Sequence, residues 1–168
     1  MKIMIYGFSG SGKSTLASYI GKKYNIPTLF LDTVHFKPGW VERDLDSQNA
    51  IIQAFMDQND AWVIDGNYSK SLMERRIEEA DQIIFMCFNR YDCYKRAYQR
   101  YLDHKGKTRE SMTAGCDETF DFEFACWILW NGRDQDKITR FTKIVEDHPK
   151  KAIMIHNQKE LDEYMKKL

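Results

Sequence analysis

The segment IMIYGFSGSGKSTLASYI, residues 3–20, places a run rich in glycine and serine directly after an apolar and aromatic stretch. Within it, Gly7, Gly12, Lys13 and Ser14 match the pattern G-x-x-x-x-G-K-[ST]. Apolar side chains at helical spacing follow the run, so the loop is expected to join a strand to a helix. That is the structural context of a phosphate-binding loop.

The residue types in this loop suit the binding of nucleotide phosphates. Glycines let backbone N–H groups approach phosphate oxygens closely, and a helix beginning near Lys13 adds its positive end. The Lys13 ammonium can reach the outer phosphates, and the Ser14 hydroxyl is placed to ligate Mg²⁺. A flexible turn without a ligand is the alternative. The expected phosphate-binding residues are Gly7, Ser9, Gly10, Ser11, Gly12, Lys13, Ser14 and Thr15.

Short apolar runs recur along the rest of the chain. They lie at 2–6, 28–31, 62–64, 83–88 and 152–155. Runs without alternation are typical of parallel strands buried on both faces. Helical patterns lie between them: Ser71 and Glu74 have capping-box spacing for one helix, with Ser69 as the alternative cap, and Asn157 with Glu160 opens the last. The alternation predicts an α/β fold with about five parallel strands and helices on both faces.

Length and composition indicate one globular domain over residues 1–168, with 43% hydrophobic and 30% charged residues. The 25 basic and 25 acidic residues cancel, so the chain has no overall attraction to nucleic acid or a membrane surface. No apolar run is long enough for a signal peptide or a membrane span, and the four cysteines form no C-x-x-C pair. We therefore expect reduced thiols and a cytoplasmic location.

Two acidic residues and two basic residues are the first candidates beyond the loop. Asp32 and Asp65 end the second and third expected strands, where ligands bind in open parallel sheets. Asp65 also begins a D-G pair, so a structural turn is its alternative. Arg96 and Arg100 are four residues apart and project from one face of an expected helix, with a solvated basic face as the alternative.

The segment LDTVHFKPGW, residues 31–40, turns at its P-G pair. Phe36 and Trp40 can stack on a planar acceptor or pack in the core, and His35 is an acceptor contact or a structural residue. Residues 103–119 are polar and glycine-punctuated. A loop of that length in a compact domain is functional or disordered, so we interpret it as a lid.

The motifs GFSGSGKSTLA, LDTVHFKPGW, WVIDGNY and RIEEAD, in this order, resemble the adenylate-kinase-like group of small P-loop kinases. The resemblance is closest to the DNA topology modulation (FlaR-related) proteins, spans most of the chain and is strongest before residue 101. It implies a three-layer P-loop fold with strand order 2-3-1-4-5, an acceptor-binding insert at about 33–60 and a small lid at about 103–119.

The resemblance also implies roles for individual residues. Lys13, Arg96 and Arg100 would act on the transferring phosphate, since arginine binds phosphate oxygens bidentately. Asp32 would take the proton of the acceptor hydroxyl, and Asp65 would hold Mg²⁺ together with Ser14. Arg109 in the lid and Arg133 after it would add contacts to the phosphates, Arg133 on the nucleotide side.

The expected acceptor contacts are Asp32, His35, Trp40, Asn67 and Tyr68. Asn67 and Tyr68 stand where adenylate kinases have a proline and an arginine that binds the acceptor phosphate. This departure disfavours a nucleoside monophosphate as acceptor. Substitute ligands for such a phosphate are Arg43, Arg75 and Arg76.

The leading hypothesis is a kinase that transfers the γ-phosphate of Mg-ATP to a small-molecule or nucleotide acceptor. The alternative is a nucleotide-dependent regulatory protein associated with DNA, as the resemblance also implies. Its support is a basic run: Lys95, Arg96, Arg100, Lys105, Lys107 and Arg109. The neutral overall charge and the lack of a recognisable DNA-reading motif favour the kinase.

Overall fold

The computed structural model describes residues 1–168. Its centre is a five-stranded parallel sheet with the strand order β2-β5-β1-β6-β7. The strands are β1 (Lys2–Gly7), β2 (Thr28–Phe30), β5 (Trp62–Asp65), β6 (Gln82–Met86) and β7 (Ala152–Ile155). When only these five strands are counted in chain order, the order in the sheet is 2-3-1-4-5. The predicted α/β fold and strand order are therefore confirmed.

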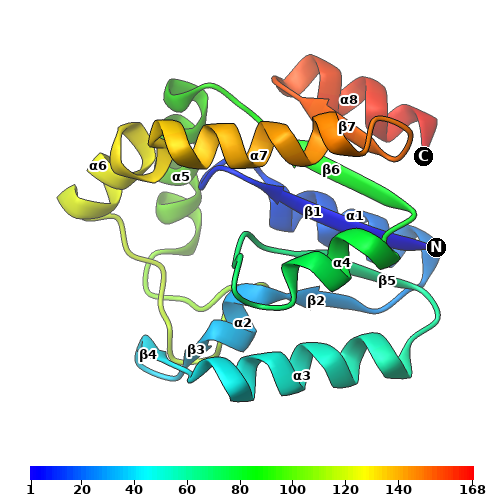
Figure 1. Ribbon diagram of the computed structural model, residues 1–168. Coiled ribbons are helices and arrows are strands. Elements are labelled where there is room, and N and C mark those ends of the chain that lie inside the picture. The colour runs from blue at the N-terminus through cyan, green and yellow to red at the C-terminus, as the bar shows by residue number, and fades with distance from the viewer.

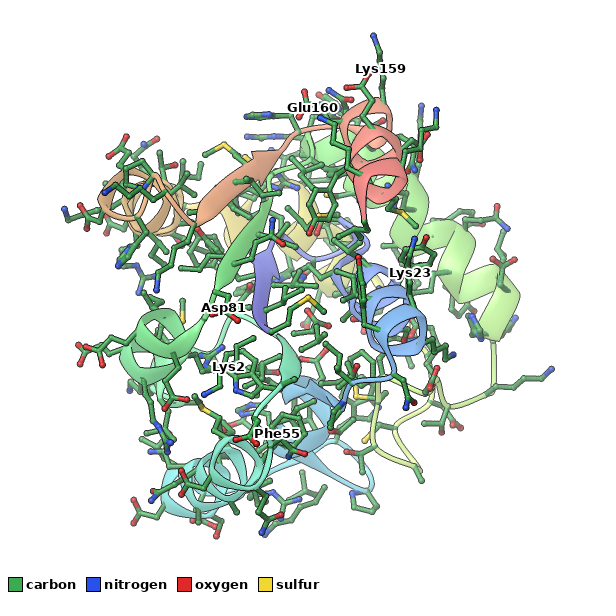
Figure 2. The ribbon with its side chains drawn as sticks, turned by 90° about the vertical axis from the view of Figure 1, so that its right-hand side faces the viewer. Lys2, Lys23, Phe55, Asp81, Lys159 and Glu160 are labelled. Carbon is green, nitrogen blue, oxygen red and sulfur yellow. The ribbon has the colours of Figure 1, made fainter.

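Helices cover both faces of the sheet, as predicted. Figure 2 shows α1 and α8 on one side of the strands and α4 and α7 on the other. The helices are α1 (Lys13–Tyr24), α2 (Leu31–His35), α3 (Leu45–Gln58), α4 (Met73–Glu79), α5 (Arg90–His104), α6 (Phe122–Leu129), α7 (Gln135–Asp147) and α8 (Gln158–Lys167), with a short 3₁₀ turn at Asn131–Arg133. No helix combines the length and the apolar character that crossing a membrane demands.

The central strand β1 explains the absence of alternation in the apolar runs. Its residues Ile3, Met4, Ile5 and Tyr6 are at most 1% exposed, because helices cover both faces of the strand. Pairing aligns Ile5 of β1 with Asp65 of β5, and Asp65 in turn with Phe30 of β2. The register therefore brings the carboxyl ends of three strands to one edge of the sheet.

The two predicted helix caps have different outcomes. Asn157 caps α8 as expected: its Oδ1 accepts a hydrogen bond from the Glu160 N–H at 3.0 Å, and its Nδ2 donates to Glu160 Oε1 at 2.8 Å. The capping box at Ser71 was wrong, because α4 begins only at Met73. Ser71 instead donates its hydroxyl to Gln48, and its carbonyl accepts from the buried Arg76 side chain. Ser69 lies still farther from the start of the helix and does not cap it either.

A small antiparallel hairpin, β3 (Phe36–Lys37) with β4 (Val41–Glu42), was not anticipated from the sequence. It lies below the sheet edge together with α2 and α3 (Figure 1). The segment after α5 runs from that helix down to the hairpin and returns to α6 (Figure 1). This path places the predicted lid across the edge where the strands end.

Candidate functional site

The loop between β1 and α1 has a backbone that requires glycine. Gly10 and Gly12 have φ angles of 79° and 95°, and a Cβ on Gly12 would overlap Nη2 of Arg96. Gly12 caps α1 without any side-chain hydrogen bond. The first N–H groups of the helix therefore remain available for an anion.

Asn67 holds the start of this loop. Its Oδ1 accepts a hydrogen bond from the Gly7 N–H at 2.8 Å, and its Nδ2 donates to the Gly7 carbonyl at 2.7 Å. Both ends of the amide are therefore engaged by the backbone of one loop residue. This geometry fits a role in orienting the loop and argues against the acceptor contact expected for Asn67.

Ser14 and Asp65, the two expected metal ligands, are in direct contact. The Ser14 hydroxyl donates to Oδ2 of Asp65 at 2.6 Å, while Oδ1 of Asp65 is buried without a hydrogen-bond partner. Burial raises the pKa of Asp65 to about 6, and the charge of Lys13 and the bond from Ser14 oppose that shift. A buried carboxylate with a free oxygen beside a hydroxyl fits a hard divalent cation such as Mg²⁺.

The remaining loop residues lie in the same turn. Lys13 bends over it and donates from Nζ to the Phe8 carbonyl at 3.1 Å. Ser11 is fully buried and its hydroxyl has no partner, whereas Thr15 is exposed. Ser9 lies between β1 and α1 together with Gly10 and Gly12, whereas Gly7 is the last residue of β1.

On the acceptor side, Asp32, His35 and Tyr68 lie together. The Tyr68 hydroxyl donates to Oδ1 of Asp32 at 2.7 Å, and the rings of His35 and Tyr68 have centroids 4.5 Å apart. Burial and the charge of Asp32 raise the pKa of Tyr68, so the phenol remains a donor. The charge of Asp32 also contributes to the raised pKa of Asp65, because the two carboxylates are neighbours.

Trp40 does not join this group. It is 40% exposed in the turn of the hairpin, and its ring meets Phe36 edge-on at 5.1 Å. Phe36 in turn contacts His35 at 4.6 Å, so two rings separate Trp40 from Tyr68. The backbone N–H of Trp40 donates to Sγ of Cys116 in the predicted lid.

Three further contacts to backbone groups attach the lid segment to the hairpin. The Thr113 hydroxyl donates to the Phe36 carbonyl at 2.6 Å, and the Gly39 N–H donates to the Gly115 carbonyl at 3.2 Å. Cys116 contacts the Lys37 carbonyl at 3.3 Å. The lid is therefore attached to the hairpin beside the edge where the strands end.

Glu118 was not among the site residues expected from the sequence. Its side chain is only 4% exposed and accepts hydrogen bonds from Nε of Arg100 at 2.7 Å and Nε of Arg109 at 2.5 Å. Asp117 and Glu118 are adjacent acidic residues in one polar segment, and only the direction of each side chain distinguishes them. No signal in the sequence could have found this residue.

Arg96 and Arg100 contact different elements although they share a helix face. The Arg96 guanidinium lies 4.7 Å above the Phe88 ring, beside the loop, and Nη1 donates to Gln158 at 2.8 Å. Burial lowers the pKa of Arg96 and of Arg100. Arg133 packs behind the loop, 3.9 Å above the Phe8 ring.

The three arginines considered as ligands of an acceptor phosphate are engaged within the chain. Arg76 is fully buried and donates to the carbonyls of residues 66, 68 and 71. Arg75 pairs with Asp57 at 2.5 Å and with Glu79 at 2.6 Å. Arg43 donates from Nε to the Val34 carbonyl at 2.8 Å. This arrangement disfavours a phosphorylated acceptor held by Arg75 or Arg76, whereas the Nη groups of Arg43 have no partner within the chain.

Comparison with known proteins gives matches by structure alone. No family model and no curated protein matches the chain. An uncharacterized protein from Eubacterium ventriosum is similar with a TM-score of 0.54 and 17% identity, covering 99% of this chain and 97% of that one. Deoxyadenosine kinase from M. mycoides, with products dCMP and a flexible dCDP bound, has a TM-score of 0.53 and 14% identity, covering 99% and 98%. The chain thus has the fold of a small P-loop kinase.

Proposed function

We propose that this chain is an ATP-dependent kinase that transfers the γ-phosphate of Mg-ATP to a hydroxyl group of a small molecule. One observation carries the proposal. Asp65 accepts a hydrogen bond from Ser14 of the phosphate loop, and sheet register aligns it with Phe30, two residues before Asp32. A metal-binding carboxylate and an acceptor-side carboxylate then flank one phosphate loop, as transfer between two bound substrates requires.

On the donor side, residues 7–15 would bind the triphosphate through backbone N–H groups, the start of α1 and Lys13. Ser14 and Asp65 would hold Mg²⁺, which when bound neutralises phosphate charge. The free Oδ1 of Asp65 supports this assignment, because a buried carboxylate oxygen without a partner is unfavourable unless a ligand satisfies it.

On the acceptor side, Asp32 would accept the proton of the attacking hydroxyl. Tyr68 engages Oδ1 of Asp32 and so orients the carboxylate. The engaged state of Arg75 and Arg76 favours an acceptor that carries no phosphate beside them.

The lid would supply cations and exclude water. Arg100 and Arg109 would stabilise charge on a transferring phosphoryl group, and the lid that carries Arg109 contacts the Thr33 carbonyl next to Asp32 through Thr113. Docking of the lid on the hairpin would limit futile hydrolysis of ATP. The insert at 33–60 and the lid at 103–119 are therefore proposed as the acceptor-binding and closing parts of a single domain.

A regulatory protein associated with DNA, of the topology modulation kind, is the second candidate. Within its basic run, Arg96, Arg100 and Arg109 bind Gln158 and Glu118, so the exposed cations are Lys95, Lys105 and Lys107. Internal use of the arginines favours the kinase, for which we propose a cytoplasmic location.

The test is an acceptor panel with γ-radiolabelled ATP and Mg²⁺, containing nucleosides, nucleoside monophosphates, sugars and hydroxy acids. The kinase proposal predicts label transfer to one class of hydroxyl compound. Tight ATP binding with no transfer to any acceptor would contradict it. Binding to duplex DNA that weakens steeply with salt would support the second candidate.

A further inference from the structure

Glu118 is a buried carboxylate in the lid, 4% exposed, beside an exposed neighbour, Asp117, that only meets the Thr108 hydroxyl. Burying a charged carboxylate is unfavourable unless opposite charges and hydrogen bonds compensate. Arg100 and Arg109 provide that compensation, one on each oxygen. The lid thus contains an ion triad with one acidic and two basic members.

The triad joins α5 to the lid segment that follows it. Arg100 belongs to α5, whereas Arg109 and Glu118 belong to the lid. Both arginines donate through Nε, at 2.7 Å and 2.5 Å. The Nη atoms of Arg100 have no partner within the chain, and Arg109 uses only Nη1, on the Ser111 hydroxyl at 3.1 Å. The contacts therefore leave both Nη atoms of Arg100 and Nη2 of Arg109 without a partner within the chain.

The lid that carries Arg109 and Glu118 contacts the residue next to Asp32, because the Thr113 hydroxyl donates to the Thr33 carbonyl at 3.2 Å. In agreement with this contact, the charge of Asp32 opposes the lowering of the Arg100 pKa by burial. Two guanidinium charges against one Glu118 carboxylate leave a net positive charge beside Asp32 and Asp65. A positive charge with free N–H donors suits a phosphoryl group.

We propose that Glu118 is a positioning residue that holds Arg100 and Arg109 by their Nε atoms, so that their free Nη groups face the transferring phosphoryl group. This inference rests on the proposed kinase function. The backbone of Glu118 is itself fixed, because its N–H donates to the Lys107 carbonyl at 3.3 Å. Because its backbone is anchored, Glu118 is expected to keep its contacts with Arg100 and Arg109 when a phosphate binds, and not to be displaced by it.

The test compares Glu118→Gln with Glu110→Gln, a matched control whose ion pair with Lys22 is on the surface. Glu118→Gln keeps the size of the side chain and removes its charge. We expect its kcat to fall by roughly 100-fold, with the KM for ATP changed less than about threefold, because misplaced arginines lose transition-state stabilisation. Glu118→Asp, which keeps the charge, should recover part of the loss.

Three results would overturn the inference. An unchanged kcat with a lowered melting temperature would show a structural role alone. A raised kcat would show that Glu118 blocks the phosphate site. A parallel loss in Glu110→Gln would show a general effect of lid charge.

A second measurement does not depend on phosphoryl transfer. Trypsin cleavage after Lys107 and Arg109 reports lid opening, and binding of a fluorescent ATP analogue reports the loop. We expect cleavage of Glu118→Gln to be roughly tenfold faster than that of Glu110→Gln, with equal analogue affinity. Equal cleavage rates would overturn the proposed connection between α5 and the lid. An inactive wild-type protein with this cleavage difference would contradict the kinase function while retaining the connection.

Discussion

The Ser14 hydroxyl lies 2.6 Å from Oδ2 of Asp65 and connects the phosphate loop to the end of strand β5. The contact follows from sheet register, because Asp65 pairs with Ile5 two residues before the loop begins at Gly7. It leaves Oδ1 of Asp65 buried without a partner. The two residues proposed to hold the cation are therefore brought into contact by the fold itself.

Asp65→Asn should weaken Mg²⁺-dependent ATP binding by about 10- to 100-fold, because an amide is a poorer ligand for a hard cation. Binding of a fluorescent ATP analogue, titrated with and without Mg²⁺, measures the effect. Asp57→Asn is the control, since Asp57 pairs with Arg75 at the surface. If Mg²⁺ changed the analogue affinity equally in wild type and Asp65→Asn, Asp65 would not be a ligand of the metal.

Asp65 should also make folding stability depend on pH. Its pKa is raised from 3.8 to about 6 by burial, so the folded chain retains a proton that the unfolded chain has released. The resulting stability is present below pH 4 and lost as pH rises through 6. The shift corresponds to about 3 kcal/mol.

Chemical denaturation in EDTA from pH 4 to pH 8 checks this dependence. The free energy of unfolding of wild type, relative to that of Asp65→Asn, should fall by about 3 kcal/mol across the range. A constant difference would show that the carboxylate titrates as it does in water.

Asn67→Ala should destabilise the fold by about 1–3 kcal/mol and weaken ATP binding, because both polar groups of Gly7 lose their partner. Asn59→Ala is the control, as Asn59 donates only to the Phe55 carbonyl. Unfolding and ATP affinity are the two readouts. An acceptor contact instead predicts a raised KM for the acceptor with unchanged stability.

Tyr68→Phe should lower kcat by roughly tenfold and leave ATP binding intact, because Asp32 loses the hydroxyl that orients it. Tyr91→Phe, at a side chain 69% exposed, is the control. Steady-state kinetics with the accepted substrate separate the two variants. A Tyr68→Phe enzyme with wild-type kcat would show that Asp32 needs no support from the phenol.

The fold was predictable because its signals are local. Continuous apolar runs indicated buried parallel strands, and the glycine pattern identified the turn after β1. The capping box at Ser71 failed because the Ser71 carbonyl binds Arg76, a contact to a side chain that no spacing rule reports. The hairpin at residues 36–42 has strands of two residues each, too short for a periodic signal.

The candidate site was only partly predictable for a similar reason. Asp32, Asp65 and the loop could be placed by topology, since strand ends meet at one edge. The role of Asn67 depends on both ends of its amide, and the role of Glu118 depends on two arginines 9 and 18 residues away. Both roles depend on the direction in which the side chain points, and packing of the loop and the lid sets that direction.

The measurement that tests the account most directly is transfer of γ-radiolabel from ATP to the accepted substrate by Asp32→Asn. Its control is Asp46→Asn, in the exposed first turn of α3. The account predicts that Asp32→Asn binds Mg-ATP as tightly as wild type but transfers phosphate at least about 100-fold more slowly, while the control is unaffected. Transfer by Asp32→Asn at the wild-type rate would contradict the account.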